Sequence, residues 1–435
     1  MGEPLMQERP TGLGRARRLG WAVVFGFLAT AMVCAEAFGA YETGWQWGTP
    51  AWEAAFAAAP GAVAGWTAGD LFAPAEGVDA FMIRLDGPEP QFWRSRLPGL
   101  ERAYALLPTT GGYYLAGTKG GTAEDPMRAQ TDAWLARLEG EAGIVWQVRV
   151  GGKLKDEARA LAPAPEGGVY LAGHGEGRIF SAGNGGSDVF VARFDAAGER
   201  LWGAQWGTDD DDYLTAAAPD GAGGVYLAGY SDVDEDCRRV SERGFVLHYG
   251  PTGELAWVYR WGTDAATRPE TLVATAGGVW VFGETDGALY GPFAGGWDVF
   301  AVFVRGPAEV RRGVQWGGSR VERVHAVVWD ASFRSFWLAG ATASDDLFGQ
   351  TEGGYDAMVV VLGDDATPAW AWKRGTPARD EAFGLAAGRE GELWVAGVTY
   401  GSLYASNAGQ ADAWAAYLCF DPYAGARERS LKCEE

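Results

Sequence analysis

A short segment of glycine, aromatic and aliphatic residues recurs along the whole 435-residue chain. Typical copies read GGVYLAG, GGVWVFG and GELWVAG, and a weaker copy reads GAVAG. The copies end at Gly65, Gly117, Gly173, Gly229, Gly283, Gly340 and Gly397, so successive copies are 52, 56, 56, 54, 57 and 57 residues apart. A fixed period is typical of repeat architectures, in which each unit buries its faces only against its neighbours. The sequence therefore predicts seven copies of one structural unit.

Two further elements keep the same period. One is a Trp…Gly-Thr segment such as LWGAQWGT, and the other is an aspartate followed by an alternating segment such as SDVFVARFD. These aspartates are Asp79, Asp132, Asp188, Asp298, Asp356 and Asp412, and Arg243 takes the place in the fourth unit. Alternation at period two indicates half-buried strands, and stretches such as PDGAGG indicate turns. With four strands in each unit, we predict an all-β fold, a seven-bladed β-propeller of four-stranded antiparallel blades.

The two ends of the repeat region indicate how the ring closes. The segment WQWGT at 45–49 has no preceding strands of its own, whereas the last unit ends at ADAWAAYLCFD without a clear Trp-Gly-Thr strand. We therefore expect the N-terminal strand to complete the seventh blade, which leaves no open sheet edge. In this interpretation the tryptophans fill the space between blades, and the small residues allow close approach near the axis.

The first residues resemble an export signal. Three arginines precede the apolar run 19–33, which is short for a membrane span, and Ala35-Glu36-Ala37 follows it. We predict a signal peptide at 1–37 cleaved after Ala37, a propeller at 38–423 and a charged tail at 424–435. An uncleaved anchor and a lipid-modified Cys34 are the alternatives. The expected location is secreted, periplasmic or at the cell surface.

Charge and cysteine content limit the partners. The formal net charge of −21 argues against nucleic acid, which requires clustered Lys and Arg. We expect a monomer that binds an envelope protein or an extracellular ligand and meets a membrane only through an uncleaved N-terminal segment. Cys419 and Cys433 could form a disulfide in an oxidising compartment, or the cysteines could be buried and unpaired.

The order of these elements resembles a known bacterial repeat. The series QWGT, acidic residues, Asp-Gly-x-Gly-Gly-Val-Tyr-Leu-Ala-Gly and Asp-Val-Phe-Val-Ala-Arg-Phe-Asp is similar to the bacterial seven-bladed β-propeller repeat, the SBBP repeat, over residues 43–421. The resemblance implies an exported or surface-attached bacterial protein. FDAAGERLWG and YGPTGELAWV also resemble pyrroloquinoline-quinone-type propeller repeats, but the adjacent cysteines of the quinone enzymes do not occur in this sequence.

A carboxylate follows the turn glycine by five residues in five of the units, and two more units carry one near the equivalent place. The seven residues are Glu53, Glu101, Asp156, Asp212, Glu270, Glu322 and Asp380. We expect them at the entry of the innermost strands, around one mouth of the axial channel. One interpretation is a ligand-binding ring of negative potential, and the other is a set of acceptors for the backbone of each turn.

The sequence predicts no catalytic residue and no cofactor, except for one calcium hypothesis. Asp232, Asp234 and Asp236 alternate like the first ligands of a calcium loop, although Cys237 replaces the turn glycine and Arg243 the closing glutamate. The sequence favours an exported, non-enzymatic binding or scaffold module of the bacterial envelope that recognises its ligand through loops at one face. The alternatives are a propeller enzyme that uses the axial channel, such as a quinoprotein, lyase or glycosidase, and an outer-membrane assembly scaffold.

Overall fold

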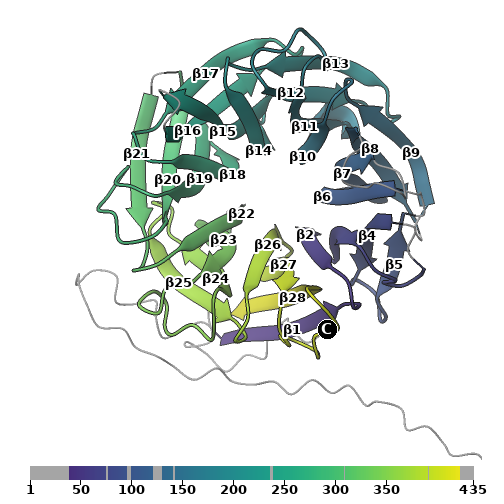
Figure 1. Cartoon of the computed structure of the whole chain (residues 1–435), viewed down its shortest axis with the longest axis vertical. Helices are drawn as coiled ribbons and strands as arrows, with labels where there is room; N and C mark the ends of the chain where they lie inside the picture. Colours follow the sequence, from purple (N-terminus) through teal and green to yellow (C-terminus); the bar gives the residue numbers. More distant parts are fainter. Residues whose placement is uncertain are drawn as a thin grey trace, which may run out of the picture.

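The computed structural model describes residues 39–421, apart from 75–76, 96–98, 121–129, 141–142, 236–238, 308 and 390. Within these residues the strands form five four-stranded sheets and one eight-stranded sheet. The eight-stranded sheet consists of two blades, which two parallel residue pairs between β4 and β6 connect. The strands therefore make seven antiparallel blades around a common axis, as Figure 1 shows. The predicted seven-bladed propeller is confirmed.

The blades follow the chain, and within each blade the strands run in order from the axis outward. Blade 1 contains β2 (Glu53–Ala59), β3 (Ala62–Thr67), β4 (Gly77–Arg84) and β5 (Gln91–Arg94), and blade 2 contains β6 (Gly99–Thr109), β7 (Gly112–Gly120), β8 (Thr131–Glu139) and β9 (Gly143–Val150). Blade 3 contains β10 (Asp156–Pro163), β11 (Val169–Glu176), β12 (Ser187–Phe194) and β13 (Arg200–Trp206), with a single 3₁₀ turn at Pro165–Gly167. Blade 4 contains β14 (Asp211–Pro219), β15 (Val225–Glu235), β16 (Arg239–Tyr249) and β17 (Leu255–Trp261). Blade 5 contains β18 (Thr267–Thr275), β19 (Gly278–Thr285), β20 (Asp298–Gly306) and β21 (Glu309–Trp316), and blade 6 contains β22 (Glu322–Asp330), β23 (Ser335–Thr342), β24 (Asp356–Leu362) and β25 (Pro368–Arg374). Blade 7 contains β26 (Asp380–Ala387), β27 (Glu392–Thr399), β28 (Asp412–Asp421) and β1 (Gly39–Trp47).

The N-terminal strand β1 closes the ring. It pairs antiparallel with β28 from Gly39 opposite Asp421 to Trp47 opposite Ala413, so the outer strand of blade 7 comes from the other end of the chain. The ring of Trp45 also stacks on Trp394, with centroids 6.3 Å apart. The predicted closure is confirmed, and the strand begins six residues before the Trp-Gln-Trp motif that revealed it.

The apolar core lies between neighbouring blades. One cluster joins Tyr114 and Leu135 of blade 2 to Leu171 and Phe190 of blade 3, and equivalent clusters lie between other blades. The largest fully buried side chains include Trp337 and Trp414. Trp337 lies on the second strand of blade 6 and Trp414 on the third strand of blade 7, so these bulky rings fill space between the blades that the innermost strands do not reach.

The repeated glycine of the second strand marks a β-bulge in the innermost strand beside it. In blade 3 the pairing between β10 and β11 shifts between Ala158 and Ala160, which leaves Arg159 as an extra residue. The bulge brings the backbone of β10 onto Gly173, where a side-chain carbon would overlap the carbonyl oxygen of Glu157. The same close approach occurs at all seven glycines. Each repeat therefore has glycine at this position, because no larger side chain fits.

The glutamine of the QWGT motif holds the long connection between the second and third strands. Gln205 accepts backbone N–H bonds from Ile179 and Phe180 and donates to Gly177 O and to Asp188 Oδ2, at 2.6 and 2.7 Å. Gln46 does the same in blade 7 from the closing strand, and Gln315 does so in blade 5.

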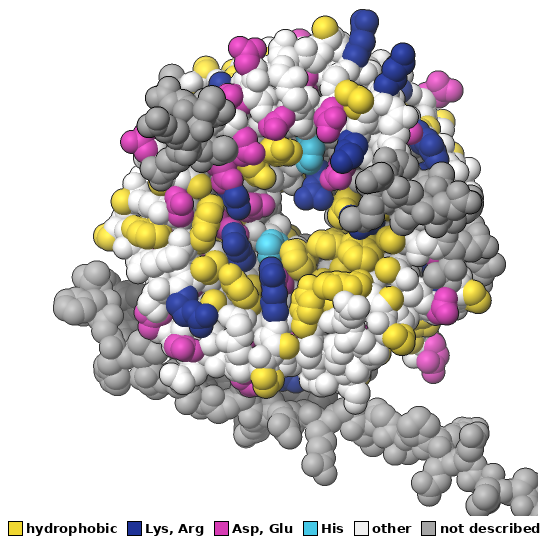
Figure 2. Space-filling view, viewed as in Figure 1, with side chains coloured by type: hydrophobic (Ala, Val, Ile, Leu, Met, Phe, Trp, Pro, Cys, Tyr) yellow, Lys and Arg dark blue, Asp and Glu magenta, His cyan; other side chains and the backbone are white. Residues whose placement is uncertain are grey.

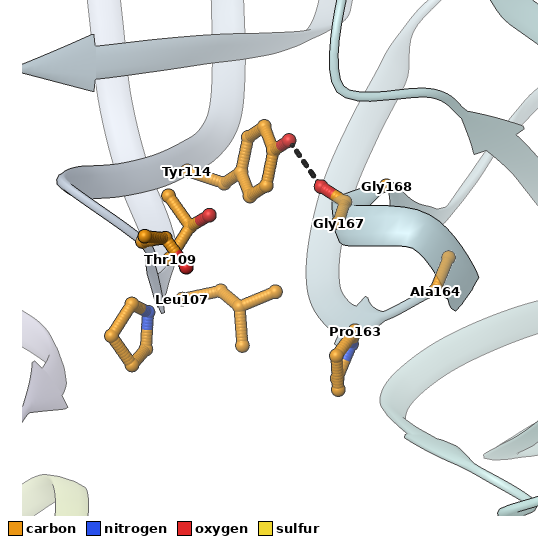
Figure 3. Close-up of a pocket in the computed structure, with 9 residues that line it drawn as sticks. Leu107, Thr109, Tyr114, Pro163, Ala164, Gly167 and Gly168 are labelled. Carbon is orange, nitrogen blue, oxygen red and sulfur yellow. Dashed lines mark hydrogen bonds between the residues drawn. The ribbon is translucent and has the colours of Figure 1, made fainter.

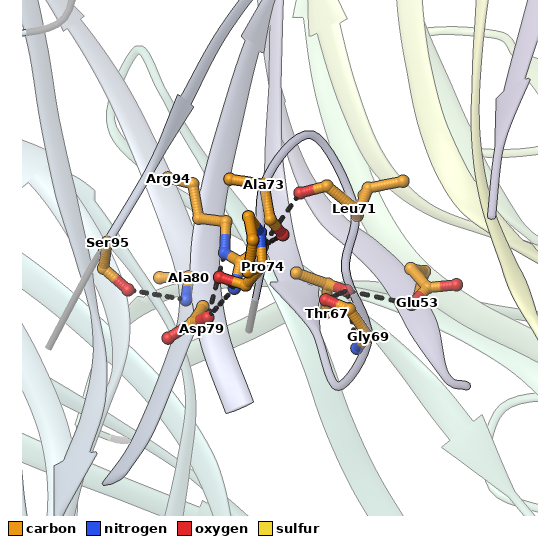
Figure 4. Close-up of polar contacts among 10 residues, drawn as sticks. All are labelled: Glu53, Thr67, Gly69, Leu71, Ala73, Pro74, Asp79, Ala80, Arg94 and Ser95. Carbon is orange, nitrogen blue, oxygen red and sulfur yellow. Dashed lines mark hydrogen bonds and ion pairs between the residues drawn. The ribbon is translucent and has the colours of Figure 1, made fainter. Parts of the chain in front are cut away.

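Blade 1 has an arginine in the position of this glutamine. Figure 4 shows that Arg94 contacts Asp79 and donates to the carbonyl groups of Leu71, Ala73 and Pro74. A guanidinium group can therefore replace the amide, because both side chains donate to the aspartate and to loop carbonyl groups at once.

Blade 4 departs from the pattern, as its sequence indicates. In place of the glycine-rich connection, β15 and β16 extend as a long hairpin that pairs Asp232 with Glu242 and Glu235 with Arg239. Cys419 is buried in β28 and is disulfide-bonded. Because Cys433 lies outside the described residues, its pairing with Cys419 stays a prediction.

Candidate binding site at the axial channel

Six of the seven predicted carboxylates lie at the start of the innermost strands of their blades. They are Glu53, Glu101, Asp156, Asp212, Glu322 and Asp380, and each is at most 4% exposed. Figure 1 shows that these strands, β2, β6, β10, β14, β22 and β26, surround the axis together with β18. The expected position at the strand entry is thus found, but the side chains are buried within the blades.

Asp380 shows how such a carboxylate is held. It accepts hydrogen bonds from the backbone N–H and hydroxyl of Thr376, at 2.7 and 2.8 Å, and from the hydroxyl of Thr399 on the neighbouring strand. Glu53 makes the same set of contacts with Thr49 and Thr67, and Figure 4 shows the bond from Thr67. These are the contacts of the turn-acceptor interpretation, and a ligand-binding role for the carboxylates stays a prediction.

Two of the six carboxylates have different partners. Glu101 forms a buried ion pair with Lys119. Asp156 accepts a bond of 2.6 Å from Gly152 N through Oδ2, while its buried Oδ1 has no partner among the described residues. Burial raises the pKa of Asp156 to about 6, because a charge is costly where few donors offset the lost water.

Glu270 does not lie with the other six. Counting from the turn glycine, Thr267 occupies the equivalent place at the start of β18, where it is buried and opposes Thr285. Glu270 falls at the β-bulge between Pro269 and Thr271. It therefore belongs to a second set of residues, which the spacing of the repeated motifs does not reveal.

This second set consists of the extra residue at each of the seven bulges. We call it the bulge ring, and it comprises Phe56, Tyr104, Arg159, Thr215, Glu270, His325 and Phe383. Arg159 is exposed and the other six are partly exposed, whereas the residue immediately before each of the seven is buried in its blade. The ring lines the axial opening, where Figure 2 shows hydrophobic side chains gathered beside β2 and β26 and basic side chains on other sides. A pattern of carboxylate, any residue, small residue, variable residue and small residue occurs in four blades as EAAFA, ERAYA, DEARA and DEAFG, and it could have revealed the ring in those blades.

One part of the bulge ring is a continuous aromatic arc. The ring of Phe383 lies 4.9 Å from that of Phe56, which lies 5.6 Å from that of Tyr104. At one end of the arc, His325 stacks on Phe383 at 4.2 Å, and at the other the guanidinium of Arg159 lies 4.7 Å from the centre of the Tyr104 ring. Each contact crosses from one blade to the next, so the arc spans blades 6, 7, 1, 2 and 3.

The two bulge-ring residues outside this arc, Thr215 and Glu270, are polar. Thr215 donates to Pro269 O at 2.8 Å, and His325 Nε2 lies 3.0 Å from Glu381 Oε2. Burial, and next the charge of Glu284, raise the pKa of Glu270 above its usual range. Burial opposes the ionisation of Glu381 as well, but the bonds and charges of His325 and Arg379 outweigh it and lower the pKa of Glu381. The pKa of Glu270 in the bulge ring is therefore raised, whereas the pKa of Glu381, which is buried against His325, is lowered.

The remaining predicted residues lie elsewhere. Asp232 and Asp234 fall in the extended strand β15, and Asp236 lies outside the described residues. Asp211, the first residue of β14, accepts a bond of 2.8 Å from Ser187 N of blade 3. Within the described part of the chain, no three His, Cys, Asp or Glu side chains are grouped as metal ligands. The same residues contain no helix of the length and hydropathy that a membrane crossing requires.

A second concavity lies between blades 2 and 3, at the ends of β6 and β10, whereas the buried carboxylates lie at the starts of these strands. It is lined by Leu107, Pro108, Thr109, Thr110, Tyr114, Pro163, Ala164, Gly167 and Gly168. Figure 3 shows Tyr114 reaching across to Gly167, whose carbonyl oxygen accepts its hydroxyl at 2.8 Å. The groove is formed by the end of β6, the start of β7 and the 3₁₀ turn that follows β10, and the hydroxyl of Tyr114 is already bonded to the neighbouring blade.

Comparison with known proteins gives structural similarity only. No family model matches the chain, and no curated protein matches its sequence. Among solved structures, the chain is similar to a polysaccharide lyase, the PL25 ulvan lyase, with 10% identity and a TM-score of 0.49 over 84% of this chain and 97% of that one. It is also similar to YCF48 bound to D1 peptide (11% identity, TM-score 0.44, 88% and 98% covered) and to the Neurospora crassa Pan2 WD40 domain (11%, 0.44, 84% and 89%). A shared propeller fold does not define a function, so the case for a function depends on the channel.

Proposed function

We propose that this chain is an exported, non-enzymatic binding module of a bacterial envelope and that its ligand binds at the axial channel. The observation that supports the proposal is a contrast between two positions of the repeat, one with the same residue in every blade and one with different residues. The glycine that accommodates each bulge is present in every blade, whereas the bulge residue itself is Phe, Tyr, Arg, Thr, Glu, His or Phe. A position that only built the blade would repeat with the blade.

An asymmetric wall suits recognition. Small-molecule sites are concave, mostly apolar and supplied with a few placed polar groups. The aromatic arc from His325 to Tyr104 supplies apolar surface, and Arg159, Glu270 and Thr215 supply polar groups. A seven-fold ring of identical residues could not distinguish the two ends of a ligand, but this ring can.

The remaining parts of the proposal rest on the sequence. The signal-peptide pattern of residues 1–37 supports export, and the resemblance to the SBBP repeat supports membership of that exported bacterial family. The hairpin of β15 and β16, which includes Ser231–Arg243, enlarges one blade and is the candidate for contacts with a partner in the envelope.

A retention experiment tests the binding function. Purified full-length protein is equilibrated with the small molecules of a bacterial envelope extract, separated by gel filtration and analysed by mass spectrometry for bound compounds. The channel variant combines Phe56→Ala with Arg159→Gln. The matched control combines Phe92→Ala with Arg149→Gln, which removes the same two residue types from exposed positions on the outer strands β5 and β9.

We expect the wild type and the control to retain a compound that the channel variant does not retain. Equal retention by all three proteins, or retention by none, would overturn the proposal. Conversion of the retained compound during incubation, abolished in the channel variant, would instead establish the enzyme alternative.

A further inference from the structure

The channel wall holds two arginines whose charge is largely unused. Arg159 is exposed and lies 3.7 Å from Glu157, in a pair whose side chains are 39% and 37% exposed. Arg102, two residues before the bulge residue Tyr104, lies over the Trp66 ring at 4.9 Å, and among the described residues no carboxylate is within ion-pair distance of it. An exposed pair such as Arg159–Glu157 contributes little, because water screens it.

Two further arginines, at the positions equivalent to Arg102 in blades 5 and 6, are neutralised. Arg268 contacts Glu242 through two guanidinium nitrogens, and Arg323 contacts Glu284, which is 2% exposed. The unused positive charge is therefore concentrated at blades 2 and 3, next to Tyr104.

The aromatic arc joins Arg102 and Arg159. Trp66, Phe56 and Phe383 pack against the same small apolar cluster, and Tyr104 lies between Phe56 and Arg159. The exposed guanidinium of Arg159 lies over the Tyr104 ring, so its planar edge, with the N–H donors, remains available, whereas the Nε of Arg102 is buried and has no partner among the described residues. Arginine edges of this kind bind carboxylates through two parallel hydrogen bonds.

The carboxyl groups that face this region do not cancel its charge. Glu381 is paired with His325 and Arg379 at the far end of the arc. Glu270 has a raised pKa through burial, which favours its uncharged form. Among the described residues, Glu157 is the carboxylate within ion-pair distance of Arg159, and none lies within that distance of Arg102.

Resting on the proposed function, we propose that the channel ligand is a small organic acid with a flat apolar ring. The ring lies against the arc of Phe383, Phe56 and Tyr104, and the carboxylate binds Arg159, with Arg102 beside it. The chain as a whole has a net charge of −21, so this local positive charge serves an anion that the remainder of the surface repels.

Three matched probes test the ligand class by calorimetric titration of the full-length protein. They are 2-naphthoate, the neutral 2-naphthamide and the cation 2-naphthylmethylammonium, which share one ring system. We expect 2-naphthoate to bind at least about tenfold more tightly than 2-naphthamide, and the cation to bind least, because only the anion gains charge-assisted hydrogen bonds.

Single variants then separate charge from stacking. Arg159→Gln is expected to remove the preference for 2-naphthoate over 2-naphthamide, whereas Phe56→Ala is expected to weaken both about equally. Arg149→Gln and Phe92→Ala, distant from the axis, should change neither affinity. Unchanged preference in Arg159→Gln, or equal binding of the three probes, would overturn the inference.

The two proposals can fail separately. If none of the probes binds while the retention experiment still yields a compound that depends on the channel, the organic-acid inference is wrong and the binding function stands. If neither experiment detects binding that depends on the channel, both are wrong.

Discussion

Two residues of each innermost strand, three positions apart, differ in almost every respect. The first is usually a carboxylate that the blade buries and surrounds with donors, as at Asp380. The second is the bulge residue, which faces the channel and changes from blade to blade, as at Phe383 and Arg159. In a repeat protein, repetition marks what every unit needs in order to fold, and a break in repetition on a fixed backbone marks surface that folding leaves free.

The largest effect is expected from substitution of the glycine that lies opposite the bulge on the second strand. Gly173→Ala places a side-chain carbon on the carbonyl oxygen of Glu157 and close to Ala158, both backbone atoms that cannot turn aside. We expect a loss of about 3 kcal/mol or more in the free energy of unfolding, the upper range for overpacking. Urea denaturation followed by tryptophan fluorescence measures it.

Gly354→Ala is the control for that substitution. It lies in a connection of blade 6 where nothing stands within 4 Å of the added carbon, and its backbone does not require positive φ. We expect a change within about 0.5 kcal/mol. A comparable loss in both variants would mean that the bulge is not the reason for the repeated glycine.

The buried carboxylates provide the next largest effect. Asp380→Ala removes the acceptor for Thr376 N and for two hydroxyls. The hydroxyls can turn to other acceptors, but the backbone N–H stays buried, so we expect a loss of about 2 kcal/mol in denaturation experiments. Asp380→Asn keeps an acceptor and should lose less, and Arg159→Gln at the channel should change stability by at most about 0.5 kcal/mol. A large loss in Arg159→Gln would remove the distinction between the two positions.

The sequence predicts the architecture well because the architecture is what repeats. The glycines of GGVYLAG, the aspartates of SDVFVARFD and the glutamines of QWGT each make a contact that recurs between blades, so their spacing reveals seven units and the closing strand. The same search misses the bulge ring, since Phe56, Arg159 and Glu270 have no common residue type to count.

Glu270 illustrates the physical limit. In the sequence it lies near the expected carboxylate position, but the blade has Thr267 there, and the bulge between Pro269 and Thr271 decides which side Glu270 faces. In a strand, a one-residue shift moves a side chain to the other face, and the bulge supplies that shift. Pairing register, which depends on the neighbouring strand, is therefore needed to assign the residue.

The smallest expected effect on stability comes from Asp156, which can be compared with Asp380 among the buried carboxylates. Its blade has Gly152 and Gly175 where blade 7 has Thr376 and Thr399, so it lacks the hydroxyl donors of Asp380. Burial raises its pKa from 3.8 to about 6. Between pH 4 and 6 the unfolded chain releases a proton that the folded protein keeps, so the free energy of unfolding falls as the pH rises and the loss is complete above about pH 6.

Asp156→Asn removes this loss while keeping an acceptor for Gly152 N. We compare the free energy of unfolding of the variant with that of the wild type at each pH. We expect this difference to favour the variant by about 1 kcal/mol more at pH 7.5 than at pH 3.5. This is roughly a third of the free energy that corresponds to the full pKa shift, because local rearrangement reduces the effect. Urea denaturation of both proteins across this range measures the difference. If the two curves stay parallel from pH 3.5 to 7.5, the missing hydroxyls impose no charge penalty, and the carboxylates of blades 3 and 7 are equivalent.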